Sequence, residues 1–70
     1  MNITDMVYSP QDWRLRLDVE GSPINALVDA TKIADAVLGA QYVVVSIDAK
    51  LAPGDDHDTM TMKIVFQKLV

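Results

Sequence analysis

The chain has 70 residues, of which 50% are hydrophobic and 23% are charged, and its formal net charge is -4. A chain of this length folds around a single core, and its apolar content excludes a disordered acidic tail. The negative charge excludes a general attraction to nucleic acid phosphates. Because there is no cysteine to form disulfides, a domain this small needs another source of stability, and we expect self-association or a permanent partner.

The first ten residues lack both the basic region and the long apolar run of a signal peptide. The longest apolar run, Tyr42 to Val45, is far shorter than the roughly 20 residues that a membrane-spanning helix needs. These features, with the absence of cysteine, predict a cytoplasmic protein that makes no membrane contact. We expect residues 1–10 to form an N-terminal arm or a short strand, and residues 11–70 to form a single domain.

The first regular segment runs from Trp13 to Glu20, where apolar and charged residues alternate. This period of two predicts a strand with one buried face. Pro23 is typical of the first position of a helix, and Gly39 is typical of the residue that ends one. Between them apolar residues recur at helical spacing, and Ala30 and Ala34 permit close approach to a sheet.

Two further strands are predicted, from Tyr42 to Leu51 and from Thr59 to Leu69, joined as a hairpin by a loop rich in aspartate. The helical crossover makes the first two strands parallel, so the third runs antiparallel to both. It fits either at the edge or between them, and we favour the central position. The predicted fold class is α+β: a βαββ domain with a three-stranded sheet and one amphipathic helix packed on one face.

One helix covers only one face of such a sheet, so the opposite face, called here the outer face, is predicted to be exposed. Matching the core faces of the hairpin places Ile47 opposite Ile64, Val45 opposite Phe66 and Ser46 opposite Val65. In this register the outer face has two partner-binding surfaces. The first consists of Arg14, Arg16, Tyr42, Val44, Val65 and Leu69. The second, an acidic end, consists of Asp18, Glu20, Asp48, Asp55, Asp56 and Asp58.

The first surface combines aromatic, aliphatic and arginine side chains, which are enriched at protein interfaces. A plainer interpretation is that a few exposed apolar residues are normal on a sheet and that the arginines balance nearby acids. The acidic end either forms a solvated turn or imitates the charge spacing of a nucleic acid towards a basic partner.

The chain offers little for catalysis or metal binding. Asp55, Asp56, His57 and Asp58 are ligand types for a divalent cation, but their spacing is not that of a calcium-binding EF-hand loop. Adjacent residues in a loop point in different directions, so we interpret them as an acidic turn without a metal. No serine or cysteine lies in a nucleophile arrangement, and we therefore predict no catalytic residue and no cofactor.

These features predict a small acidic non-enzymatic protein-binding module that self-associates, for example as a homodimer, and binds a larger protein or protein complex. In size and charge it is comparable to phage-encoded inhibitors of host complexes, an analogy that no motif supports. Two alternatives stay open: an acidic nucleic-acid mimic that occupies a basic groove, and a self-assembling structural subunit. No direct nucleic acid partner is expected.

Overall fold

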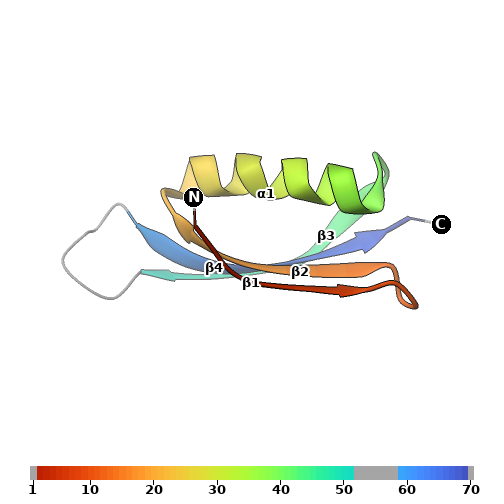
Figure 1. Ribbon diagram of the computed structural model, residues 1–70. Coiled ribbons are helices and arrows are strands. Elements are labelled where there is room, and N and C mark those ends of the chain that lie inside the picture. The colour runs from red at the N-terminus through yellow and green to blue at the C-terminus, as the bar shows by residue number, and fades with distance from the viewer. Residues whose placement is uncertain (1, 52–58, 70) are drawn as a thin grey trace.

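The computed structural model describes residues 2–51 and 59–69. These residues form one antiparallel sheet with the strand order β1-β2-β4-β3 and a single helix along one of its faces (Figure 1). The elements are β1 (Asn2–Ser9), β2 (Arg14–Gly21), α1 (Pro23–Leu38), β3 (Tyr42–Leu51) and β4 (Met60–Lys68). The fold is α+β, and β4 lies between β2 and β3, which confirms the central position predicted for the last strand.

The prediction of a three-stranded sheet is wrong because the N-terminal segment forms a fourth strand. Strand β1 pairs with β2, with Ile3 opposite Val19 and Tyr8 opposite Leu15. A β-bulge between Ile3 and Asp5 inserts one extra residue into β1. The bulge shifts the side-chain alternation by one position, so the segment lacks the regular period of two by which a strand is recognised.

Strand β2 and helix α1 follow the pattern of the sequence closely. Trp13 is in the turn before β2, with a φ of 53°, so the strand begins one residue later than predicted. The helix ends as expected at Gly39, which has a φ of 84° and donates its N–H to the Asp35 carbonyl at 3.0 Å. Positive φ is accessible to glycine without steric cost, and this explains the abrupt end of the helix.

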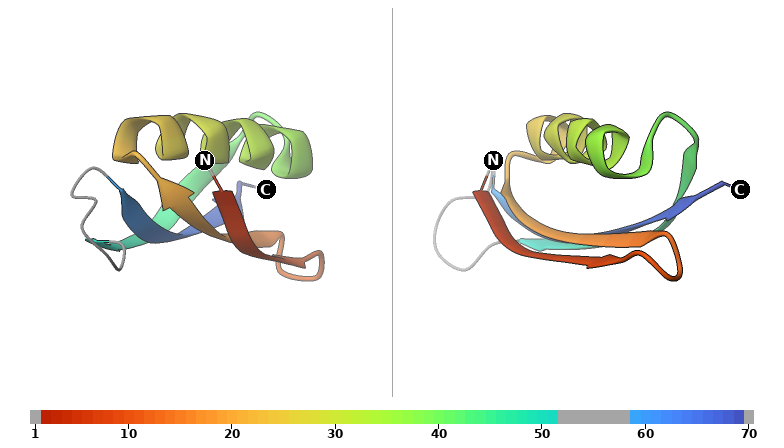
Figure 2. Two further views of the ribbon diagram at one scale, coloured as in Figure 1. Left: turned by 60° about the vertical axis from the view of Figure 1, so that its left-hand side comes forward. Right: turned by 45° about the vertical axis from the view of Figure 1, so that its right-hand side comes forward.

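The hydrophobic core is formed by alternate residues of β2 and β4 beneath one stripe of α1. Helix α1 packs on these two central strands (Figure 2). The buried side chains are Leu15, Leu17, Val19, Ala26, Ala30, Ala34, Leu38, Met62, Ile64 and Phe66.

The edge strands β1 and β3 extend beyond the reach of the helix. With its side chains a helix is about 10 Å wide, whereas four strands span three spacings of about 4.8 Å. Side chains of the edge strands that point to the helix side therefore stay accessible: Met6 of β1 is 52% exposed and Ile47 of β3 is 50% exposed.

Strand β3 contains a second bulge, between Val44 and Ser46. After the bulge in the chain the predicted register is confirmed, with Ile47 opposite Ile64 and Ser46 opposite Val65. Before the bulge the predicted register is wrong, because Val44 instead of Val45 lies opposite Phe66. The extra residue in β3 reverses the face to which every preceding side chain of the strand points.

Tyr42 and Val44 consequently point to the helix side of the sheet, and their predicted position on the outer face is wrong. The Tyr42 ring packs edge-on against Phe66, with ring centroids 5.4 Å apart and an interplanar angle of 89°. Its hydroxyl donates a hydrogen bond to the Thr31 carbonyl of α1 at 3.2 Å. Tyr42 thus ties β3 to the helix and does not face a partner on the opposite side.

The alanine stripe of α1 leads to a stability prediction. Ala30→Leu inserts a large side chain where the helix backbone meets the sheet, and we expect the free energy of unfolding to fall by about 1–3 kcal/mol. Ala36→Leu is the matched control, because Ala36 is exposed on the same helix. Urea denaturation measures both variants, and an equal loss in the two would contradict the close packing of α1.

Tyr42 leads to a prediction about pH. Burial raises the pKa of its hydroxyl above the ordinary value of 10.0. The Asp35 carboxylate raises the pKa further, because it is an alternative acceptor for the hydroxyl proton and carries a negative charge. The folded state thus favours the protonated hydroxyl. This stabilisation is complete below about pH 10 and is lost as the pH rises through the higher folded-state pKa.

Tyr42→Phe has no ionisable hydroxyl at this position. We therefore expect the free energy of unfolding of the wild type to fall relative to that of Tyr42→Phe above about pH 10. Urea denaturation of both proteins from about pH 8 to about pH 12 measures the difference. A difference that does not change with pH would show that the hydroxyl titrates alike in the folded and unfolded states.

Candidate functional site

The outer face of the sheet is the side that points away from α1, and no element of the described chain covers it (Figure 2). Three predicted site residues, Arg14, Arg16 and Val65, lie on it in adjacent cross-strand rows. Their neighbours in these rows include the apolar residues Val7 and Val43. We define the arginine patch as Val7, Arg14, Arg16, Val43, Val65 and Gln67.

The two arginines of the patch have different environments. The Nη2 atom of Arg16 lies 2.6 Å from Asp5 Oδ2, and its Nε lies 3.4 Å from Asp18 Oδ1. Arg14 instead donates from Nε to Gln67 Oε1 at 3.2 Å, and no carboxylate of the described residues lies within ion-pair distance of it. Arg14 is therefore the cation of this patch that is available to an external acidic group.

Gln67 holds the Arg14 side chain in place. Its Nε2 atom donates to the Asp12 carbonyl at 2.7 Å, so the Oε1 atom is left to accept from Arg14. Trp13 lies in the same turn, with Lys68 Nζ 4.4 Å from its ring centroid. The β1–β2 turn thus fixes one end of the arginine patch. The half-exposed Trp13 of this turn contacts Lys68 and is not part of the patch.

Some members of the patch were missed by sequence reasoning. Val43 was missed because it has the same alternation as Val45, which is predicted to face Phe66 in the core, and the bulge in β3 leaves no sign in that alternation. Val7 was missed because residues 1–10 were expected to form an arm or a short strand and were not included in the predicted three-stranded sheet. Gln67 has the same alternation as Val65, which predicts the outer face, but an amide alone does not suggest a binding site. Leu69 was predicted in this set and lies just beyond β4, half exposed, with its N–H bonded to the Gln41 carbonyl at 3.0 Å.

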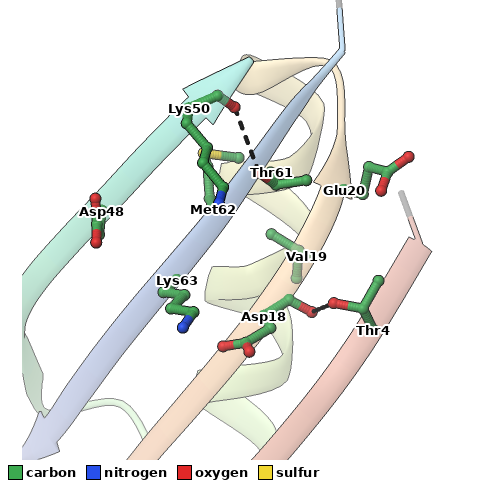
Figure 3. Close-up of a pocket in the computed structure, with 9 residues that line it drawn as sticks. All are labelled: Thr4, Asp18, Val19, Glu20, Asp48, Lys50, Thr61, Met62 and Lys63. Carbon is green, nitrogen blue, oxygen red and sulfur yellow. Dashed lines mark hydrogen bonds between the residues drawn. The ribbon is translucent and has the colours of Figure 1, made fainter. Parts of the chain in front are cut away.

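The acidic end is only partly as predicted. Asp18, Glu20 and Asp48 lie together on the outer face, where they line a shallow pocket (Figure 3). Lys50 and Lys63 line the same pocket, so three carboxylates are interleaved with two ammonium groups. The remaining residues of this set, Asp55, Asp56 and Asp58, lie outside the described residues.

Cross-strand pairing explains how the charges of the pocket are arranged. Lys63 of β4 lies opposite Asp18 of β2 on one side and opposite Asp48 of β3 on the other. Opposite charges in directly facing positions stabilise a sheet. Thr4 and Thr61 complete the rim, and their hydroxyls donate to the Asp18 and Lys50 carbonyls at 3.2 Å and 3.5 Å. The local charge is therefore balanced more evenly than the net charge of the chain suggests.

Within residues 2–51 and 59–69 no three side chains of the metal-ligating types come together. The predicted metal-ligand candidates around His57 lie outside these residues. The helix α1 is too short and too polar to cross a membrane.

Comparison of the chain with protein-family models, with curated proteins and with solved structures finds no match.

Proposed function

We propose that the protein is a small non-enzymatic binding module whose arginine patch contacts a larger protein or protein complex. One observation supports this proposal above the others. Arg14 has no carboxylate partner among the described residues, although it lies on an uncovered face of an acidic protein. An arginine needed only to balance the charge of its own sheet would lie against one of the aspartates, as Arg16 does.

The surroundings of Arg14 fit a protein partner. Its planar guanidinium can donate two parallel hydrogen bonds to a carboxylate, which gives both strength and direction. Val7 and Val43 are 47% and 44% exposed in the adjacent rows, and they can exclude water from such an ion pair. The hydrogen bond from Arg14 to Gln67 reduces the side-chain freedom that binding must remove. The partner surface we expect is a carboxylate within an apolar rim.

The proposed effect of binding is inhibition. A chain of 70 residues acts on a larger complex most simply by occupying a surface that another component needs. We place this action in the cytoplasm, in keeping with a chain that has no cysteine. Nucleic-acid mimicry has less support, because Lys50 and Lys63 interrupt the carboxylates of the acidic end.

Charge reversal tests the arginine patch. Arg14→Glu places a carboxylate where the partner is expected to present its own, and we expect the affinity to fall by at least about tenfold. Lys32→Glu is the matched control: it makes the same change in net charge, but at an exposed position on α1. We expect its affinity to equal that of the wild type.

The partner for this measurement can be captured in the native host by a photoreactive amino acid in place of Val7, and its affinity measured by isothermal titration. An equal effect of Arg14→Glu and Lys32→Glu would show that only the net charge matters and would contradict the proposal. A patch that desolvates an ion pair keeps its affinity at high salt, whereas a steep loss with salt would favour mimicry.

A further inference from the structure

Strand β3 is an edge strand with an open side. It is 10 residues long and pairs only with β4 among the described strands. The opposite side of such a strand presents backbone N–H and C=O groups that can pair with another strand. The bulge between Val44 and Ser46 interrupts only the first half. From Ile47 to Leu51 the strand is regular, so this half can serve as a template for pairing.

The helix side of β3 also carries uncovered apolar side chains. Val44, Ile47 and Leu51 are 46%, 50% and 60% exposed. We call these three residues the β3 shelf.

We propose that the occupant of this edge is a second copy of the same chain, paired antiparallel along β3 about a twofold axis at Ala49. In an antiparallel pair, directly opposite residues point to the same face. Centring on Ala49 places Asp48 of each copy opposite Lys50 of the other on the outer face. On the helix side it places Ile47 opposite Leu51. Charged and apolar side chains are then both matched.

Neighbouring registers lack this complementarity. A pairing centred on Asp48 or on Lys50 puts two like charges directly opposite each other, which destabilises a strand pair. A pairing centred on Ile47 puts Asp48 opposite Ser46 and leaves the charges unmatched. No ion pair within the described chain engages Asp48 or Lys50, so both are available to a second copy.

The other edge of the sheet does not offer the same match. Strand β1 has a single charged residue, Asp5, which already contacts Arg16 of its own sheet at 2.6 Å. Two β1 strands therefore have no opposite charges to exchange. Charge complementarity distinguishes β3 from β1 and identifies the partner as this chain itself.

The pairing joins two four-stranded sheets into one continuous sheet with both helices on the same side. It also covers an edge and part of the β3 shelf, both of which a small monomer leaves exposed to water. This inference does not depend on the proposed function, because it uses the edge of β3 and not the arginine patch.

A charge swap tests the proposed register. Asp48→Lys and Lys50→Asp each place like charges opposite each other twice in the homodimer, and we expect each to weaken dimerisation by about tenfold or more. An equimolar mixture of the two variants restores two attractive pairs, so we expect heterodimers to form. Recovery in the mixture shows that both variants are folded. Analytical ultracentrifugation from about 1 µM to about 1 mM measures the equilibrium.

Cross-linking provides a second measurement. Ala49→Cys brings the two thiols together at the twofold axis, at a spacing that a disulfide can bridge. The chain has no other cysteine, so mild oxidation should give a covalent dimer. Lys32→Cys on the exposed side of α1 is the control and should give far less.

A monomeric wild type across the concentration range overturns the proposal. So does a dimer that tolerates both charge reversals, or one in which Ala49→Cys cross-links no better than Lys32→Cys, since the contact then lies elsewhere. Arg14→Glu should dimerise as the wild type does. If this variant loses partner binding and still dimerises, the arginine patch and the β3 edge act independently. Each of the two proposals can then fail without the other.

Discussion

The contact between the alanine stripe of α1 and the two central strands determines what the rest of the molecule exposes. Ala26, Ala30 and Ala34 are fully buried, and because their side chains are short the helix backbone lies close to the sheet. Apart from Leu38 at the end of α1, the large fully buried side chains come from the sheet, with Leu15 and Phe66 among them. A helix held this closely covers β2 and β4 and cannot extend over β1 or β3. The accessible edges and the uncovered outer face both follow from this one contact.

The regular parts of the fold could be predicted from the sequence, and the irregular parts could not. Strand β2, helix α1 and the pairing of Ile47 with Ile64 follow from uninterrupted periodicities of two and 3.6 residues. The missing fourth strand and the wrong face of Tyr42 have one cause, a β-bulge in each edge strand. An extra residue reverses the alternation of side chains between the two faces, and neither bulge contains a residue type from which it could be predicted.

The candidate site shows a different kind of limit. Arg14, Arg16 and Val65 were placed on the correct face, because β2 and β4 contain no bulge. Lys63 has the same alternation as Val65, so the sequence also predicts it on the outer face beside the carboxylates. The predicted acidic end nevertheless included acidic residues alone. The contact of Gln67 with Arg14 joins residues 53 positions apart. Such a contact depends on strand order and turn geometry, which the spacing of residues along the chain does not give.

The bulge in β3 divides the strand into halves with different roles, and this makes the two proposed interfaces compatible. Before the bulge, Tyr42 binds the helix and Val43 belongs to the arginine patch. After it, residues 47–51 form the regular edge at the opposite end of the sheet. A twofold axis at Ala49 keeps both outer faces on one side, so a dimer presents two arginine patches on a single surface. If both proposals hold, two linked patches would bind a partner with matching repeated sites more tightly than one patch does, so the proposed dimer would act directly on the proposed binding.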